Sequence, residues 1–167
     1  MMSAYVILVL VSFERLAELV ISSRNTKRLL ADGAIEVGAG HYPFIVAVHT
    51  GWIIALFSWA SLAPAELNLI WAALYVAIQP LRAWVILTLG RFWTTRIIVP
   101  KNVPLVQRGP YKFISHPNYV VVVLEIAVLP LVIGAWPVAV AFSILNACVL
   151  WVRIRAENHS LQSRSVA

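Results

Sequence analysis

Residues 119–152 read YVVVVLEIAVLPLVIGAWPVAVAFSILNACVLWV, and this stretch decides the fold. Two apolar runs, 119–134 and 137–152, flank the sequence Gly134-Ala135-Trp136-Pro137. Glycine permits a sharp turn, and proline is favoured in the first turn of a new helix. Neither run alternates with the period of two that is typical of barrel strands, so both are predicted to be helices. We therefore expect a tight antiparallel helical hairpin.

Three more apolar runs precede the hairpin, at 4–22, 42–62 and 67–89. The chain of 167 residues is 61% hydrophobic and only 12% charged, which excludes an ordinary water-soluble domain. About 20 apolar residues are needed to cross the roughly 30 Å of hydrocarbon in a bilayer. The sequence thus predicts an all-α integral membrane protein with about five transmembrane helices.

We expect one membrane domain over residues 1–167. In it, 1–89 supplies three N-terminal spans, and 90–167 supplies a catalytic loop, the hairpin and a C-terminal helix. The first run contains charged residues and lacks a convincing small-residue cleavage site. We expect it to remain in the mature protein as a span.

The basic residues indicate how the protein lies in the membrane. All 13 lysines and arginines except Arg15 and Arg82 lie in segments that follow the first, third or fifth span. Cytoplasmic loops of membrane proteins carry an excess of positive charge. We expect these segments to be cytosolic, with the N-terminus outside and the C-terminus inside a bacterial plasma membrane. These basic residues either serve only to set the orientation of the protein in the membrane, or they also attract anionic ligands or lipids.

The hairpin is predicted to bring two distant polar segments to the same depth. If the turn is centred within 135–136, residues at equal depth have numbers that sum to about 271. The polar segment 108–119 then lies beside the segment 153–161. A proline follows His116 and presents this histidine at the helix mouth, while Asn118 is expected to cap the helix. The pairs expected at equal depth are Glu125 with Asn146, Tyr119 with Val152, and His116 with Arg155.

Several of these residues have both structural and functional interpretations. Arg153 and Glu157 are four apart and share a helix face; alone they are typical of a solvated salt bridge. The segment 108–119 alone is typical of an interfacial loop. Glu125 lies in mid-span, where an unpaired carboxylate is costly, so it is either a hydrogen-bond partner of Asn146 or a proton acceptor.

The other intramembrane charges are expected to pair between helices. Glu14 and Glu18 share a face of the first span and Arg82 lies in the third, so a contact of Arg82 with one of them is expected. No histidine or cysteine spacing indicates a metal site, and no glycine-rich phosphate loop is present. Nothing in the sequence indicates a nucleic-acid partner.

The polar segments around the hairpin resemble the signature of the isoprenylcysteine carboxyl methyltransferase family and related small membrane methyltransferases. The family pattern reads Gly-x-Tyr, then Arg-His-Pro-x-Tyr, then a helical hairpin, then Arg-Ile-x-x-Glu-Glu-x-x-Leu. The resemblance covers roughly residues 91–161. The corresponding segments here are Gly109-Pro110-Tyr111, Ser115-His116-Pro117-Asn118-Tyr119 and RIRAENHSL at 153–161.

The resemblance implies a membrane-embedded methyltransferase with S-adenosylmethionine bound at the cytosolic end of the hairpin. A lipophilic acceptor would enter from the lipid bilayer. Methyl transfer mainly requires that donor and acceptor are held in line and that water is excluded. The resemblance assigns to the cofactor pocket the residues Tyr111, His116, Pro117, Tyr119, Arg153 and Glu157.

Two departures from the family pattern concern the acceptor. Ser115 stands where the family has arginine, and Asn158 where it has a second glutamate. An arginine suits an acceptor carboxylate, so these replacements argue against prenylcysteine, the alternative substrate. The stretch 91–100, RFWTTRIIVP, resembles the bacterial branch associated with long-chain alkyl phenols and pyrones, which favours a hydroxyl acceptor. The predicted substrate-binding residues are Ser115, Asn146 and Asn158, and the predicted catalytic residues are Glu125, Arg153 and His116.

Two hypotheses without catalysis stay open. The intramembrane charges suit a small transporter or channel subunit, and the chain also suits a structural membrane subunit. A transporter predicts polar residues through the whole bilayer, whereas an enzyme predicts them at the cytosolic end. The sequence favours the enzyme, because the His, Tyr, Arg and Glu cluster lies at that end. It does not indicate the oligomeric state.

Overall fold

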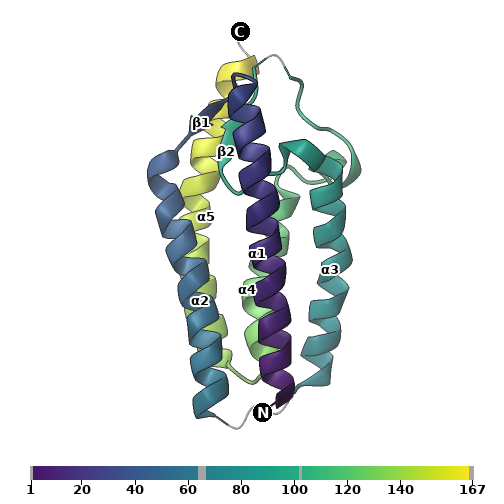
Figure 1. The fold of residues 1–167 in the computed structure, drawn as a ribbon, viewed down its shortest axis with the longest axis vertical. Coiled ribbons are helices and arrows are strands. Elements are labelled where there is room, and N and C mark those ends of the chain that lie inside the picture. Colours follow the sequence, from purple (N-terminus) through teal and green to yellow (C-terminus); the bar gives the residue numbers. More distant parts are fainter. Residues whose placement is uncertain (1, 64–66, 102, 166–167) are drawn as a thin grey trace.

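The computed structural model describes residues 2–63, 67–101 and 103–165, with side chains as far as Asn158. These residues form five α-helices that run side by side in an elongated bundle (Figure 1). The all-α prediction is confirmed. The helices are α1 (Met2–Ala31), α2 (Tyr42–Leu62), α3 (Leu69–Leu89), α4 (Pro117–Val132) and α5 (Trp136–Ser165).

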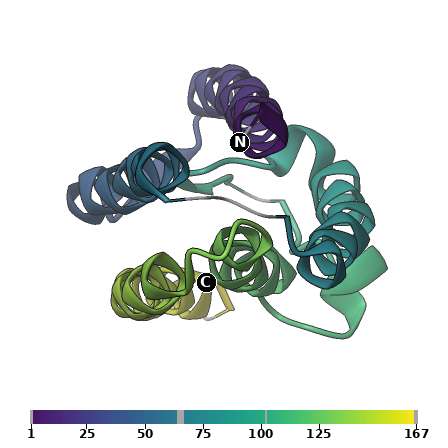
Figure 2. The same cartoon turned by 90° about the horizontal axis from the view of Figure 1, so that it is seen from below.

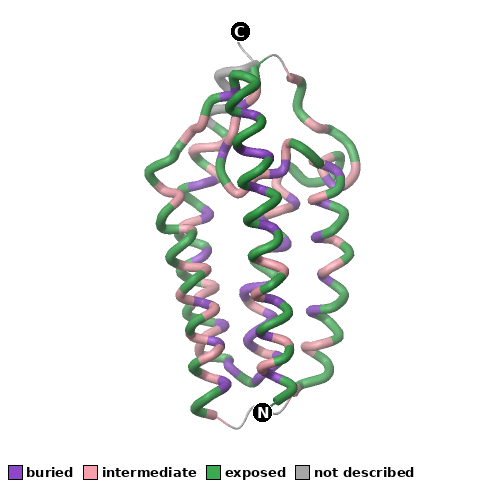
Figure 3. The backbone as a smooth tube through the Cα atoms, viewed as in Figure 1, coloured by how far each residue is buried: buried purple, intermediate pink, exposed green. Residues whose placement is uncertain are grey.

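Within the described residues, three segments are long and apolar enough to cross a membrane: Ala39–Leu62, Leu69–Phe92 and Trp136–Asn158. α4 is apolar but shorter, with 16 residues, and α1 carries charged residues in its middle. The outer faces of the bundle are exposed (Figure 3), and they carry large apolar side chains such as Phe13 (68% exposed) and Ile70 (79%). Such a surface suits lipid rather than water. The protein is an integral membrane protein.

The predicted hairpin is confirmed. α4 ends at Val132, Gly134 adopts a left-handed φ of 69°, and α5 begins at Trp136. The amide of Ala135 donates a hydrogen bond to the carbonyl of Pro130 (2.9 Å), which closes the turn. Figure 2, viewed along the bundle, shows α4 between α3 and α5, in agreement with the packing of α4 against both.

The start of α4 differs from the prediction in one respect. The helix begins at Pro117, and its N-cap residue is His116, whose side chain makes no capping bond. Asn118 lies inside the first turn, so its predicted capping role is wrong. The physical reason is that proline suits the first helical position, since its missing N–H has no partner to lose there. The cap position therefore falls one residue before the proline.

A short antiparallel ribbon joins two connections, and the sequence did not reveal it. β1 (Ile35–Val37) pairs with β2 (Ile97–Val99), with Glu36 opposite Ile98. Nη1 of Arg96 lies 3.1 Å from a carboxylate oxygen of Glu36. Strands of three residues that are far apart in sequence leave no pattern that can be recognised. The remaining short elements are the 3₁₀ helices η1 (Ala39–His41), η2 (Gly90–Phe92) and η3 (Gly109–Lys112).

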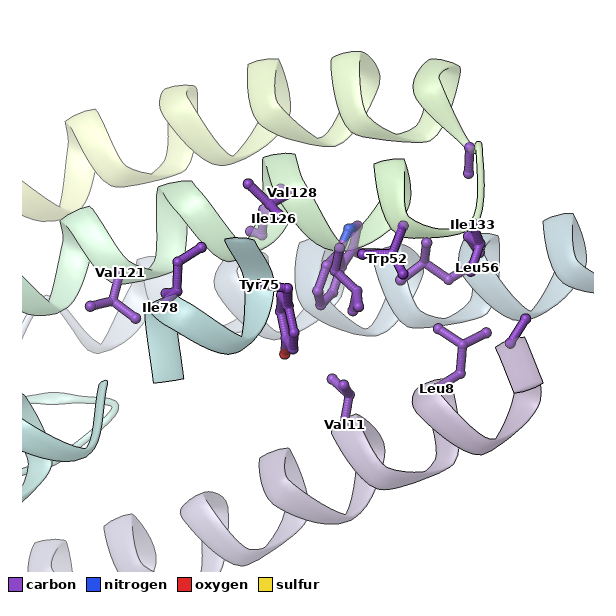
Figure 4. Packing of buried hydrophobic residues seen from close by; sticks show 14 of the residues in the cluster. Leu8, Val11, Trp52, Leu56, Tyr75, Ile78, Val121, Ile126, Val128 and Ile133 are labelled. Carbon is purple, nitrogen blue, oxygen red and sulfur yellow. The ribbon is translucent and has the colours of Figure 1, made fainter. Parts of the chain in front are cut away.

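The apolar core lies where α1, α2, α3 and α4 face one another. Leu8 of α1 and Leu56 of α2 are fully buried, and Trp52 is 3% exposed. Figure 4 shows Tyr75 of α3 among the same apolar side chains, with Val121 of α4 at one end of the cluster. This packing fixes the helices that carry the polar sites.

The ribbon, the connection between α3 and α4, and the ends of α1 and α5 gather at one end of the bundle (Figure 1). The predicted cytosolic segments therefore lie together. The opposite end holds the turn between α4 and α5.

Candidate functional site

A cavity of about 460 Å³ lies at the end of the bundle where the α3–α4 connection folds back. One part of its wall is polar and comes from η3, the start of α4 and the last turns of α5. The other part comes from the segment between α3 and η3 and is mainly apolar, with Thr94, Arg96 and Gln107 as its polar members. The apolar lining includes Leu89, Phe92, Trp93, Ile97, Ile98, Val99, Pro100, Val103, Pro104, Leu105 and Val106; the polar lining includes Tyr111, Ser115, His116, Asn118, Tyr119, Arg153, Glu157 and Asn158.

Tyr119 is the centre of the polar wall. Its hydroxyl donates a hydrogen bond to the carboxylate of Glu157 and accepts one from Nε of Arg153 at 2.8 Å. The Arg153 guanidinium also lies over the Tyr119 ring, 5.4 Å from its centroid. The arginine and the glutamate are thus joined through a phenol in a charge-assisted network.

His116 extends this network. Its ring stacks on Tyr119 with centroids 5.2 Å apart and an interplanar angle of 17°. Its Nε2 lies 3.1 Å from Oδ1 of Asn158, and its Nδ1 lies 3.7 Å from the Glu157 carboxylate. The segments before α4 and at the end of α5 therefore meet, as predicted from the position of the hairpin turn.

The register of the two segments is shifted from the prediction. His116 meets Asn158 instead of Arg155, and Tyr119 meets Arg153 and Glu157 instead of Val152. Helical side chains lean toward the N-terminus of their own helix. Side chains of α4 therefore lean toward the cavity and those of α5 lean away from it. The contacting residue of α5 must lie further along the chain, which raises the sum of the paired numbers.

Two more predicted residues line the cavity. Ser115 lies at its rim between η3 and α4, and Tyr111 belongs to η3. Burial, followed by the negative charge of Glu157, raises the pKa of the Tyr111 hydroxyl well above its usual range. Tyr111 therefore stays a neutral donor at physiological pH. η3 itself is held close to α3, since a Cβ at Gly109 would meet Oγ1 of Thr88 at 2.5 Å.

Three predicted site residues do not line the cavity. Pro117 is buried and starts α4, Asn146 is 2% exposed within α5, and Glu125 is 3% exposed within α4. The expected bond between Glu125 and Asn146 is wrong, because the Glu125 carboxylate is bound by Arg15, Arg82 and Gln79 instead.

Those partners form a separate cluster inside the bundle. Arg82 of α3 donates to both Glu18 of α1 and Glu125 of α4. Arg15 contacts the same two carboxylates, at 3.1 Å for Glu18 and 3.0 Å for Glu125. The predicted contact of Arg82 with Glu14 or Glu18 is confirmed. The cluster links three helices and neutralises most of its own charge, as intramembrane charges usually do.

Sequence reasoning missed the polar residues that hold the α3–α4 connection. Ser22 and Asn25 of α1 are 2% and 7% exposed. The Ser22 hydroxyl binds Thr95, and the Asn25 amide donates to the carbonyls of Gly90 (3.1 Å) and Trp93 (2.8 Å). The sequence contains a usable signal, because polar residues continue along one face of the first span beyond Glu18, at Ser22 and Asn25.

The comparison with protein families decides the class of this site. A family model described as the isoprenylcysteine carboxyl methyltransferase family matches residues 71–163. The chain belongs to the isoprenylcysteine carboxyl methyltransferase family. The matched segment contains α4, the α3–α4 connection and most of α5, and thus the whole lining of the cavity. Membership makes the protein a membrane methyltransferase.

Two relatives extend the similarity to the rest of the chain. An uncharacterized protein of Bacillus subtilis (strain 168), YpbQ, is 38% identical over 165 residues, which cover 97% of this chain and 98% of the relative. An uncharacterized protein of Haemophilus influenzae is 26% identical over 151 residues, 88% of each chain. No solved structure matches the chain significantly.

Proposed function

We propose that this methyltransferase transfers a methyl group from S-adenosylmethionine to the hydroxyl of a lipophilic acceptor, such as a long-chain alkyl phenol or pyrone. One observation supports the proposal: the cavity is lined both by the His116, Tyr119, Arg153 and Glu157 network and by many apolar side chains of the α3–α4 connection. A polar cofactor and an apolar acceptor need such a divided site. The cavity volume lies within the range usual for small-molecule sites.

The polar wall has the donor and acceptor groups that the cofactor needs. The Glu157 carboxylate suits ribose hydroxyls, and the Arg153 guanidinium suits the carboxylate of the methionine part. The aromatic rings of Tyr119 and Tyr111 suit a sulfonium cation. When bound, S-adenosylmethionine supplies an electrophilic methyl group. The residues of this chain need to orient it, exclude water and take up the proton that the acceptor hydroxyl releases.

His116 is the candidate acceptor of that proton. It lines the cavity, and one of its ring nitrogens lies beside Asn158, so the ring is held in place. Glu125 was the other candidate from the sequence. It is separated from the cavity lining and is bound by two arginines, which suits a structural role.

The acceptor is proposed to be uncharged because the cations of the cavity already have partners. Arg96 lies 3.1 Å from Glu36, and Arg153 is assigned above to the carboxylate of the cofactor. Ser115 provides no charge. A buried carboxylate without a cationic partner carries a desolvation penalty of several kcal/mol. A hydroxyl avoids this penalty.

The apolar wall is proposed to receive the hydrocarbon tail from the bilayer. Ile98, Leu105 and Val106 belong to this wall, and Leu105 is 54% exposed. We propose further that all five helices span the membrane, with the N-terminus outside and the cavity at the cytosolic end. The basic segments gathered at this end support that orientation.

The test uses the purified protein in lipid nanodiscs with S-adenosylmethionine labelled in the methyl group. A long-chain alkyl phenol, a long-chain hydroxypyrone and a prenylcysteine are offered separately. We expect label in the phenol or pyrone and little in prenylcysteine. Longer tails should lower the apparent KM, at up to about 0.8 kcal/mol for each buried methylene.

The opposite preference would favour the second candidate function, carboxyl methylation of prenylcysteine, which the family name supports. Absence of label in every acceptor, from protein that binds the cofactor, would contradict the proposed acceptor class. Equal turnover of short, water-soluble phenols would contradict entry from the bilayer.

A further inference from the structure

Thr95 lies where α1, α2 and α5 meet the α3–α4 connection. Its amide donates to Oγ of Ser22 at 2.8 Å, and its own Oγ1 lies 2.8 Å from the same Ser22 oxygen. The Thr95 hydroxyl is also 3.1 Å from the Tyr42 hydroxyl of α2. On its other side, the Thr95 carbonyl accepts a hydrogen bond of 2.7 Å from Nη1 of Arg153. One residue thus connects the N-terminal helix to the polar wall of the cavity.

The rest of the connection is fixed on both sides of Thr95. Before it, Asn25 of α1 binds the carbonyls of Gly90 and Trp93, and Trp93 is 3% exposed. After it, the Arg96 side chain is bound by Glu36 and lies over the Tyr42 ring at 4.7 Å. The position of the Thr95 carbonyl is therefore set by α1, α2 and the ribbon.

That carbonyl is one of two anchors of Arg153. The other is the Tyr119 hydroxyl, which accepts from Nε. Bonds to Nε and Nη1 together fix the plane of the guanidinium, whose remaining Nη2 has no partner among the described residues. Without the carbonyl, a long side chain with several rotatable bonds would keep a single anchor.

We propose that Ser22 and Thr95 are positioning residues of the methyltransferase. α1, which lies outside the matched segment 71–163, holds the Thr95 carbonyl so that Arg153 presents its free Nη2 to the cofactor. The catalytic unit is then larger than the family segment. This inference rests on the proposed function, because it assigns Arg153 to cofactor binding.

The test compares three single variants of the full chain in lipid nanodiscs. Ser22→Ala removes both bonds to Thr95, whereas Thr95→Ser keeps every hydrogen-bonding atom. Ser12→Ala is the matched control, since the Ser12 hydroxyl donates only to the Leu8 carbonyl within α1. Calorimetry gives the Kd for S-adenosylhomocysteine, the stable product of methyl transfer, and thermal unfolding gives the stability of each variant.

We expect Ser22→Ala to weaken S-adenosylhomocysteine binding by about 3- to 10-fold, in line with the loss of a net hydrogen-bond contribution. Thr95→Ser and Ser12→Ala should remain within about twofold of wild type. An unchanged Kd in Ser22→Ala would overturn the proposal. Equal weakening in Ser12→Ala would also overturn it, because the effect would then be one of helix stability.

Hydrogen–deuterium exchange of the protein without ligand provides a second readout. The Thr95 amide should exchange about 10-fold faster in Ser22→Ala and unchanged in Ser12→Ala. If wild-type protein bound no S-adenosylhomocysteine, the proposed function would fail, and exchange would still decide whether Ser22 holds Thr95. Faster exchange in Ser22→Ala alone would support the role of Ser22 in positioning Thr95. Equal exchange in all variants would overturn it.

Discussion

In the part of the chain that the structure describes, the intramembrane network and the network at the cavity both join arginine to glutamate, and they differ in how their charges meet. Inside the bundle, Arg82 contacts Glu18 and Glu125 directly. At the cavity, Arg153 and Glu157 meet through the Tyr119 hydroxyl, and the network lines open space. The charged groups of the first network face one another, whereas the network at the cavity lines a space that a ligand can fill. We therefore regard the first network as structural and the second as functional.

The largest effect is expected from breaking the intramembrane network. Arg82→Leu would leave the carboxylates of Glu18 and Glu125 to share Arg15. Removing one partner of a buried ion pair typically costs about 3–5 kcal/mol of unfolding free energy. Denaturant unfolding in mild detergent measures the loss. Arg24→Leu, at an exposed position of α1, is the control and should change stability by less than about 1 kcal/mol.

A loss below about 1 kcal/mol in Arg82→Leu would contradict the structural role of this network. The intramembrane network could then no longer be distinguished as structural from the network at the cavity.

A smaller effect is expected when a charge is added to the cavity. Ser115→Arg places a cation at its rim and should favour an acceptor with a carboxylate. A charge-assisted hydrogen bond contributes about 1.5–3 kcal/mol, so the turnover ratio of prenylcysteine to alkyl phenol should rise at least about tenfold. Competition assays with both acceptors measure the ratio. An unchanged ratio would show that Ser115 does not set acceptor charge.

The smallest effect is expected at the exposed pair of the ribbon. The side chain of Arg96 is 43% exposed and that of Glu36 is 20% exposed. Exposed ion pairs contribute about 0–1 kcal/mol. Glu36→Gln should therefore lower the unfolding free energy by no more than about 1 kcal/mol and change cofactor affinity by less than about threefold. A larger loss of affinity would mean that the contact between Glu36 and Arg96 is needed to hold the α3–α4 connection at the cavity.

Much of the fold followed from apolar runs and turn residues. The hairpin was predictable because Gly134 and Pro137 separate two long apolar runs, and its two ends carry the polar motifs. The bounds of α2 and the end of α3 also agree with the predicted spans. Hydropathy could not predict the β1–β2 ribbon, since its pairing depends on contacts between short segments far apart in sequence.

The candidate site was predictable only in part, for reasons of side-chain geometry. The spacing of Arg153 and Glu157 places them on one helix face, but it does not reveal that Tyr119 joins them. Glu125 was predicted to face Asn146 because only the hairpin was considered. Its partners Arg15 and Arg82 come from α1 and α3. Residue numbers alone do not show which faces of these two helices pack against α4.

The central claim is that the network at the cavity binds S-adenosylmethionine and that the intramembrane network does not. Equilibrium binding of labelled S-adenosylmethionine to wild type, Glu157→Gln and Glu125→Gln tests it most directly. We expect Glu157→Gln to weaken binding by about 5- to 150-fold, equivalent to about 1–3 kcal/mol, at nearly unchanged stability. Glu125→Gln should lower stability and leave affinity within about twofold. Normal affinity in Glu157→Gln, together with a large loss in Glu125→Gln, would show that the intramembrane network, and not the network at the cavity, binds the cofactor.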